Sequence, residues 1–397
     1  MENKNKVVVN GSTKEILKLL KKGGLVVQVG ESKIDEVKTA EMVEFAMKNG
    51  INYFDTAWPY HGGMSERIMG KILSKYPRDS FYLANKFPGH QISATYDPAA
   101  TFEEQLRRCG VEYFDFYLLH NVYEKSIKTY LDPRWGILEY FKEQKKLGRI
   151  KHLGFSTHGS IGLIEEFLDI CGEDMEFCQI QLNYLDWTLQ DAKAKYDMLT
   201  HRGIPIWVME PVRGGKLAAL SDENSAKLKA LRPDEKDVAW CFRFLQSLPN
   251  VTMTLSGMSN MAQIQENIAT YAEDKPLNPA ELETVFSIAE GMKNSVPCTS
   301  CRYCCDGCPA GLEIPRLLAI LNDMRFAPVV NTSMLVEAMP EEKRPSACIS
   351  CGKCTKICPQ GIDVPALMEE LTDRLAKLPS WAEVSRQREE EQKKNQE

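Results

Sequence analysis

The sequence predicts an α/β fold in which a (β/α)8 TIM barrel precedes a smaller, helical, cysteine-rich domain. From Leu25 to about Ala269, short apolar runs alternate with amphipathic stretches of helical length. Eight such runs over roughly 250 residues match the size and rhythm of a (β/α)8 barrel. Beyond the barrel, the cysteines crowd into the segment between Cys298 and Cys358.

The expected strands are apolar runs that end in polar residues. A doubly wound sheet also alternates strands with helices, but it usually has a glycine-rich phosphate loop after its first strand. The segment VQVGESK (27–33) fits that loop poorly, which favours the barrel. The eight predicted strands are LVVQV (25–29), INYF (51–54), FYLANK (81–86), FDFYLLH (114–120), IKHLGFS (150–156), FCQIQL (177–182), IPIWVM (204–209) and VTMTLS (251–256).

Composition and charge narrow the class of protein. The 397 residues are 43% hydrophobic and 26% charged, as in an ordinary folded protein. A net charge of −6 argues against a nucleic-acid or anionic-membrane surface. There is no apolar run of membrane-spanning length, and the charged N-terminus lacks a signal-peptide core, so we expect a cytoplasmic protein. We divide the chain into a barrel (1–272), a linker helix (273–296), a cysteine domain (297–380) and a charged tail (381–397).

Two copies of one cysteine motif follow the barrel. Residues 298–309 read CTSCRYCCDGCP and residues 348–359 read CISCGKCTKICP. Both fit C-x2-C-x2-C-x3-C-P, the run of bacterial two-cluster ferredoxins, in which the fourth cysteine binds the other cluster. The motifs therefore predict two [4Fe–4S] clusters, one held by Cys298, Cys301, Cys304 and Cys358, and the other by Cys348, Cys351, Cys354 and Cys308.

The repeat extends beyond the cysteines. CPAGLEIPRLL (308–318) aligns with CPQGIDVPALM (358–368), which predicts two halves related by approximate two-fold symmetry, as in helical dicluster ferredoxins. Zinc sites are the alternative, since they also use C-x2-C pairs. A zinc site needs neither the third cysteine at this spacing nor the C-P ending. Cys305 is surplus to the motif, and we expect it to be a bystander.

Three successive barrel strands run into an ionisable residue at their C-terminal ends, which are Asp55, Lys86 and His120. Tyr60 lies a few residues beyond the first of them, in DTAWPYHGGMSE. A single histidine or tyrosine in such a place usually has a packing role. Their joint occurrence at the face where barrel enzymes hold their catalytic groups predicts an active site.

The segments NYFDTAWPYHGGMSERIMGK, YLANKFP, QLRRCGVEYFDFYLLH and HLGFSTH resemble the aldo/keto reductase family, in particular its bacterial and archaeal branch fused to a dicluster ferredoxin domain. The resemblance covers roughly residues 34 to 375 and implies that Asp55, Tyr60, Lys86 and His120 form the catalytic tetrad. Tyr60 would protonate the carbonyl oxygen, and the Lys86 ammonium would lower the pKa of the phenol. Asp55 would hold Lys86, His120 would orient the substrate, and hydride would come from NADP(H) or NAD(H).

The resemblance also implies contacts to the coenzyme. Ser156 and Gln179 match positions that bind the nicotinamide carboxamide, and Arg213 and Gly214 match the pyrophosphate loop. At the adenosine end the corresponding residues are Ser256, Gly257, Gln263 and Asn267.

The chain departs from the family pattern at several of these positions. The first strand is rewritten, and Met209 stands where an aromatic residue usually stacks on nicotinamide. Gly257 and Gln263 replace the Lys and Arg that many members place on the 2′-phosphate, which weakens a preference for NADPH over NADH.

Two functions follow from this sequence. The first is a nicotinamide-dependent oxidoreductase that interconverts small carbonyls and alcohols and carries an iron–sulfur electron-transfer module. The second is an electron-transfer or redox-sensing protein whose barrel is a docking scaffold. A hydride carries two electrons and a cluster passes one. The clusters therefore exchange electrons with a partner protein or with an undetected cofactor, or they are purely structural. Of these, we expect redox-active clusters that face a partner protein. No flavin motif is recognisable, although a barrel can bind FMN through a phosphate site without one.

Overall fold

The computed structural model divides into two units, Met1–Phe286 and Ser287–Glu397, which are described separately. The predicted strand at 25–29 and nearly all of the predicted tail lie outside the described residues. In the described part of the chain, no helix is long and apolar enough to cross a membrane. The structure describes residues 34–380 and Glu383, except 59, 91–94, 124–125, 190, 293–295, 297, 299–301, 327–335, 338 and 359.

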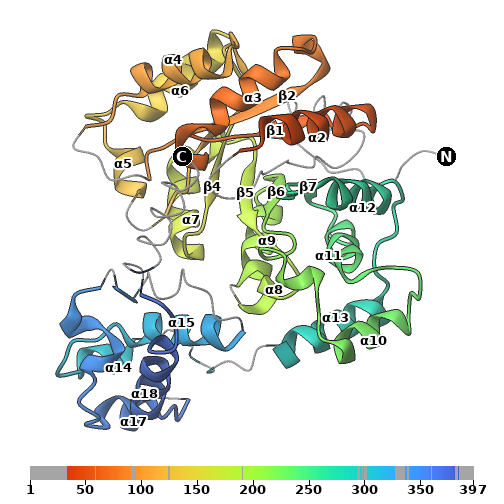
Figure 1. The fold of residues 1–397 in the computed structure, drawn as a ribbon. Helices are drawn as coiled ribbons and strands as arrows, with labels where there is room; N and C mark the ends of the chain where they lie inside the picture. The colour runs from red at the N-terminus through yellow and green to blue at the C-terminus, as the bar shows by residue number, and fades with distance from the viewer. Residues whose placement is uncertain are drawn as a thin grey trace. The chain divides into compact units, whose positions relative to one another are not determined.

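The first unit is built on a parallel sheet of seven strands in the order β1 to β7 (Figure 1). Each strand pairs with the next one along the chain, and each matches one of the predicted apolar runs. The strands are β1 (Tyr53–Asp55), β2 (Tyr82–Phe87), β3 (Phe114–Leu119), β4 (Ile150–Thr157), β5 (Cys178–Gln181), β6 (Ile206–Met209) and β7 (Val251–Thr254).

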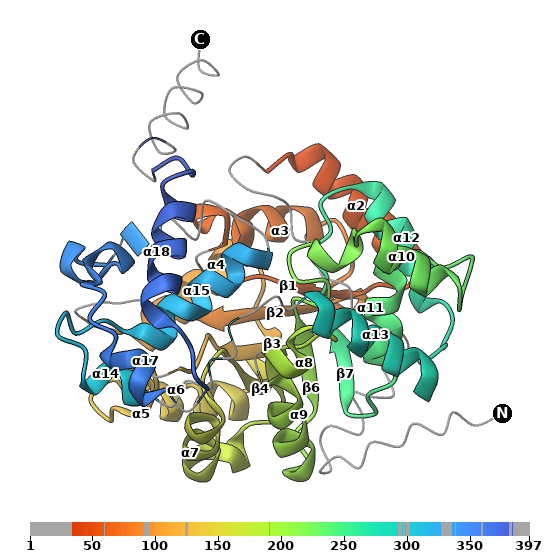
Figure 2. The same cartoon turned by 90° about the horizontal axis from the view of Figure 1, so that it is seen from below.

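Helices connect the strands and flank the outer side of the sheet (Figures 1 and 2). Four of them lie in the amphipathic stretches of the sequence at 38–49, 65–76, 136–148 and 237–248. The helices of this unit are α2 (Glu36–Lys48), α3 (Ser65–Leu73), α4 (Pro98–Cys109), α5 (Ile127–Leu131), α6 (Ile137–Lys146), α7 (Ile161–Cys171), α8 (Asp186–Leu189), α9 (Ala192–His201), α10 (Asp222–Lys229), α11 (Asp237–Gln246), α12 (Met261–Tyr271) and α13 (Pro279–Met292), the last of which continues into the second unit.

Helix α4 shows how local sequence sets these bounds. The side chain of Asp97 accepts a hydrogen bond from the Ala100 amide at 2.9 Å, and Pro98 occupies the first turn, where its missing N–H costs nothing. Gly110 ends the helix with φ of 64°, a left-handed conformation that glycine adopts readily.

The interior of the curled sheet is filled by large side chains. Phe177 and Trp207 pack with their ring centroids 4.5 Å apart, and Phe116 contacts both rings. This interior cluster closes the space below the C-terminal strand ends, as side-chain layers do in (β/α)8 barrels. Its buried members are Tyr53, Ala84, Phe116, Leu118, Phe177, Trp207, Met253 and Leu255.

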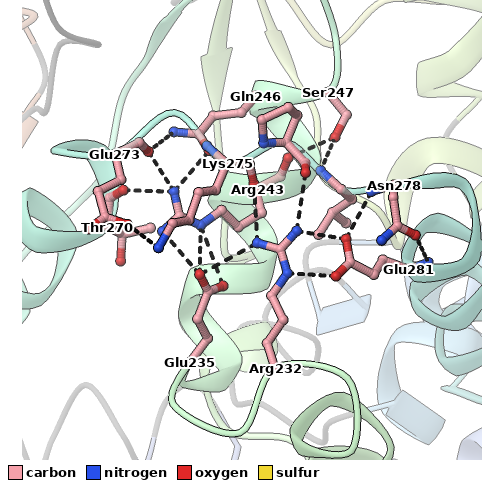
Figure 3. Close-up of polar contacts among 12 residues, drawn as sticks. Arg232, Glu235, Arg243, Gln246, Ser247, Thr270, Glu273, Lys275, Asn278 and Glu281 are labelled. Atoms are coloured by element: carbon pink, nitrogen blue, oxygen red, sulfur yellow. Dashed lines mark hydrogen bonds and ion pairs between the residues drawn. The ribbon is translucent and has the colours of Figure 1, made fainter.

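A network of arginines fastens the start of α13 to the barrel helices (Figure 3). Arg232 forms a two-pronged ion pair with Glu281 at 2.7 and 2.6 Å. Arg243 donates to the carbonyl oxygens of Thr270 and Glu273, which lie at and just after the end of α12. Because these carbonyls have no partner inside their own helix, the guanidinium groups satisfy them.

The described elements of the second unit are helices joined by loops, namely α14 (Tyr303–Asp306), α15 (Ile314–Phe326), α17 (Lys353–Ile357) and α18 (Val364–Leu375). Helices α15 and α18 pack together, and Arg325 pairs with both carboxylate oxygens of Glu370. The apolar core of the unit includes Cys304 and Cys354.

Where both are described, the two cysteine motifs share left-handed backbone positions. The residue before the first short helix, Arg302, has φ of 68°, and its counterpart Gly352 has φ of 69°. After the fourth cysteine, Gly311 and Gly361 have φ of 57° and 63°. The repeat seen in the sequence is thus a repeat in structure, including an arginine held where glycine would be less strained.

We expect Gly70→Ala to lower the free energy of unfolding by about 1–3 kcal/mol through overpacking. A Cβ at Gly70 in α3 would lie 2.5 Å from the backbone oxygen of Cys109 in α4, and backbone cannot rotate away as a side chain can. Denaturant unfolding monitored by circular dichroism measures the change. Gly162→Ala in α7 is the matched control, because nothing lies within 4 Å of its Cβ, and it should be neutral or stabilising. Equal effects of the two substitutions would contradict this packing.

Candidate active site

The candidate catalytic residues form the layer above the interior cluster. Successive side chains of a strand alternate in direction, so residues two apart point the same way. The layer therefore contains Asp55 two positions after Tyr53, Lys86 after Ala84, Gln179 after Phe177 and Met209 after Trp207.

Lys86 lies at the centre of this layer and is fully buried. Its Nζ forms an ion pair with Oδ2 of Asp55 and donates to the Thr56 carbonyl oxygen at 2.9 Å. Nζ also lies 4.7 Å from the centroid of the Tyr60 ring. Although burial disfavours the ammonium, Asp55 and Tyr60 outweigh it and raise the pKa of Lys86 above its ordinary value. The lysine is therefore charged at neutral pH.

The pKa of Tyr60 is affected by burial as well as by Lys86. Burial raises the pKa of the phenol. Lys86 lowers it, as expected, but by less, so the net direction is upward. The phenol is thus held protonated, as a proton donor must be before it reacts.

His120 completes the group immediately after β3. Its ring lies 5.8 Å from the Tyr60 ring, nearly perpendicular to it at 83°. Burial, together with the Lys86 charge, holds the pKa of His120 well below its ordinary value, so the imidazole is neutral. The Tyr130 hydroxyl contacts the carbonyl oxygens of His120 and Phe87 at 2.8 and 3.1 Å, which fixes the ends of β3 and β2 together.

Sequence reasoning missed His90, which lies in the loop after β2. Its ring centroid is 4.3 Å from that of His120, and burial lowers its pKa. Gly89 allows the loop to run close to Tyr130 and so to hold His90 in this place, because a Cβ at residue 89 would lie only 2.6 Å from the Tyr130 ring. The sequence signal was a Pro-Gly-His turn directly after a catalytic strand.

Sequence reasoning also missed a buried polar network behind the strand. Asn85 directly precedes Lys86 on β2, so its side chain points to the opposite face of the sheet, toward α3 and α4. Its Nδ2 donates to Glu66 at 3.0 Å, and Gln105 donates to Glu66, to Asn85 and to the Lys86 carbonyl oxygen at 2.9–3.0 Å. Arg108 neutralises the fully buried Glu66 at 2.9 Å. The network holds the backbone of Lys86 from the outer side.

The residues implied for nicotinamide lie side by side. Ser156 on β4 and Gln179 on β5 are paired in the sheet register, and both are buried. Ser156 Oγ accepts from the Asn121 amide at 2.8 Å, whereas Oε1 of Gln179 is buried without a partner in the described chain. An unpartnered buried acceptor fits a carboxamide donor supplied by a ligand.

The residues implied for the rest of the coenzyme are partly engaged by the protein. Arg213 pairs with the buried Asp186 at 3.1 Å, and it stands beside Gly214 in a left-handed turn after β6. Asn267 donates to Ser256 at 3.1 Å. Gln263 accepts from the Ser259 amide at 2.7 Å and so supports the start of α12, near the exposed Gly257.

In the second unit, four cysteines line one cavity. They are Cys308, Cys348, Cys351 and Cys354, the set predicted for one cluster, with the fourth ligand supplied by the other motif. Apolar side chains, including Leu312, Ile314, Val364 and Met368, form much of the remaining wall. Thiolates in an apolar pocket fit the ligand chemistry of an iron–sulfur cluster. Of the other predicted set, Cys298, Cys304 and Cys358 pack in the same core, and Cys301 lies outside the described residues.

Comparison with known proteins identifies both units. Residues 20–290 match the aldo/keto reductase family. The chain belongs to this family. Residues 297–362 match a 4Fe-4S dicluster domain, which decides between iron–sulfur and zinc ligation in favour of iron–sulfur. This aldo/keto reductase is thus an oxidoreductase with an attached iron–sulfur module.

The relatives of the aldo/keto reductase unit are distant in sequence, but the alignments cover most of each relative's own length. An NADH-specific methylglyoxal reductase of Escherichia coli is 24% identical over 62% of this chain and 86% of its own. L-galactose dehydrogenase of Arabidopsis thaliana is 25% identical over 64% and 84%. Among solved structures, the holo form of a Bacillus halodurans aldo-keto reductase has a TM-score of 0.53 and 25% identity, over 67% of this chain and 91% of that one.

We expect the free energy of unfolding to fall as the pH decreases from 7 to 5. His120 has a lower pKa in the folded protein than in the unfolded chain, so the unfolded state binds more protons in this pH window. Lowering the pH therefore stabilises the unfolded state relative to the folded state. His120→Gln should therefore reduce the slope of stability against pH, measured by denaturant unfolding at several pH values. His201→Gln, at an exposed position, should retain the full slope. The assignment is wrong if both variants behave alike.

Proposed function

We propose that the barrel reduces small carbonyl compounds, or oxidises the corresponding alcohols, with a nicotinamide coenzyme. The observation that supports this most strongly is the buried Lys86 ammonium, which Asp55 holds on one side while it faces the Tyr60 ring on the other. The proposal includes closure of the barrel by an eighth strand at 25–29, in line with the family fold.

Each group of the tetrad has a distinct role in the proposed reaction. The hydride for the carbonyl carbon would come from a bound NAD(P)H. Tyr60 gives its proton to the carbonyl oxygen, and the neighbouring Lys86 stabilises the phenolate that remains. Asp55 keeps Lys86 charged, and the neutral His120 hydrogen-bonds the substrate oxygen. One carbonyl and one NAD(P)H thus give one alcohol and one oxidised coenzyme after a proton from water restores Tyr60.

Ser156 and Gln179 would hold the nicotinamide carboxamide, and Arg213 and Gly214 the pyrophosphate. Ser256, Gly257, Gln263 and Asn267 would surround the adenosine end. With no cation at Gly257 or Gln263, the binding of NADPH gains no direct charge pair at the 2′-phosphate. We therefore infer that NADH serves at least as well as NADPH, and one relative is named as NADH-specific.

We further propose that the second unit holds two [4Fe–4S] clusters in a helical ferredoxin-type arrangement, with the ligand sets given by the motifs. The clusters would exchange single electrons with a partner protein. We also propose that the protein is located in the cytoplasm. The cavity that joins three cysteines of one motif to Cys308 of the other supports the crossed ligation.

Tyr60→Phe should lower kcat for carbonyl reduction by about 10²–10⁴, because the proton donor is lost while the ring remains. Steady-state kinetics with a panel of aldehydes and ketones measures kcat, and coenzyme fluorescence should report unchanged NADH binding. Tyr76→Phe, at a tyrosine of the loop after α3, should retain full activity. If wild type binds NADH but reduces no carbonyl, the barrel is the docking scaffold of the alternative function.

Iron analysis tests the clusters. The anaerobically purified protein should hold about eight irons and eight acid-labile sulfides per chain, as two [4Fe–4S] clusters require. Cys351→Ser should remove about half of the iron. Cys305→Ser is the matched control, since Cys305 is surplus to the motif, and it should retain all of it. Equal loss in both variants would overturn the ligand assignment.

A further inference from the structure

The two cysteine motifs have matching left-handed positions at 302 and 352 and at 311 and 361, but they differ in the residues that lie between the cysteines. The second motif has Ile349 and Ile357, with 65% and 53% of their surfaces exposed. The first motif has a threonine and a glycine at these positions. Large apolar side chains that are exposed within one short motif are candidates for a contact site.

The second motif also has two lysines, where the first has a tyrosine and an aspartate. Lys353 and Lys356 both lie on α17 and are exposed. Neither forms an ion pair or side-chain hydrogen bond with the described residues. By contrast, Arg302 pairs with Glu313, and Lys343 donates to carbonyl oxygens of the first motif. Two uncompensated ammonium groups give this surface a local positive potential.

This same surface gives access to the cysteine cavity. Cys351 is exposed, and it lines the cavity together with Ile349 and Lys353. Cys354 in the cavity and Cys304 of the other motif are buried. Single-electron transfer weakens steeply with distance, so an exposed ligand is the favoured point of exchange with another protein.

We propose that Ile349, Cys351, Lys353, Lys356 and Ile357 form a docking face for an acidic protein that carries a one-electron centre. The lysines attract the partner and the isoleucines exclude water at the contact. One electron passes from the reduced partner to the cluster beneath Cys351, so the partner is oxidised, the cluster is reduced, and no bond forms or breaks. A face of this size suits a weak, short-lived complex, as redox partners form. The inference rests on the proposed cluster assignment and not on carbonyl reduction by the barrel.

The test uses the full-length, cluster-loaded protein and a reduced acidic [2Fe–2S] ferredoxin as the probe. Stopped-flow absorbance under anaerobic conditions gives the second-order rate constant for cluster reduction. We expect this constant to fall with increasing salt, because the encounter is steered by charge. Carbodiimide cross-linking of the two proteins, mapped by mass spectrometry, should join ferredoxin carboxylates to Lys353 or Lys356.

The double variant Lys356→Asp with Ile357→Gly introduces the residues of the first motif, which has Asp306 and Gly307 at the corresponding positions. Its rate constant with ferredoxin should fall about tenfold or more and lose its salt dependence, and the cross-links should weaken. Reduction by a neutral viologen should be unchanged, which excludes a damaged cluster. Lys229→Asp on α10 is the control, since that lysine is exposed on the other unit, and it should behave as wild type.

The outcomes separate this inference from the function proposed above. A fully loaded double variant that reacts with ferredoxin as fast as wild type would overturn the docking face alone. The same holds for a wild-type rate that does not depend on salt. A protein without bound iron would overturn the cluster assignment, and the docking face with it.

Discussion

The barrel site depends on one buried charge. Transfer of an ammonium group from water into a protein interior costs several kcal/mol unless partners replace its hydration. For Lys86 these partners come from the neighbouring strand, as the Asp55 carboxylate and the Thr56 carbonyl oxygen. The register of β1 against β2 sets Asp55 opposite Ala84, so Lys86 has to reach only two residues along the same face. With two partners fixed, the remaining direction of the ammonium is toward Tyr60, and this gives the site its chemistry.

The position of Lys86 is also supported from the outer side of the sheet, where β2 faces helices α3 and α4. Asn85, Gln105 and Glu66 form closed hydrogen-bonded loops, and Arg108 supplies the cation that the buried Glu66 requires. The guanidinium of Arg108 in turn lies 3.8 Å from the Trp58 ring, in the loop that leads to Tyr60. The helices α3 and α4 thus position both Lys86 and the approach to Tyr60. Groups held on regular elements with satisfied supporting contacts keep a catalytic geometry more accurately than groups on free loops.

How far the sequence predicts this site depends on the range of the interaction. The strands and the places of Asp55, Lys86 and His120 follow from local alternation and were predicted. The partners of Glu66 come from 19 to 42 residues away, on other elements, and no local pattern pairs them. The lowering effect of Lys86 on the Tyr60 pKa was predicted, whereas the larger effect of burial depends on how deeply the folded protein encloses the phenol. The spacing of the cysteines predicts a ligand set from the sequence alone, and four of that set line one cavity, whereas the exposure of Cys351 appears only in the folded loop.

That exposure bears on what the clusters do. The cysteines pack within the apolar core of their unit, so ligation and folding of this unit are linked, as in other small metal-binding domains. A cluster with a structural role alone gains nothing from an exposed ligand, because solvent access only exposes its thiolate to oxidation. Burial of all four ligands would serve stability better. The second motif exposes Cys351 and carries isoleucines and lysines where the first has none, and these lysines have no ion-pair partner among the described residues, which supports contact with another redox protein. Such contact also avoids the mismatch between a hydride, which moves two electrons together, and a cluster, which moves one.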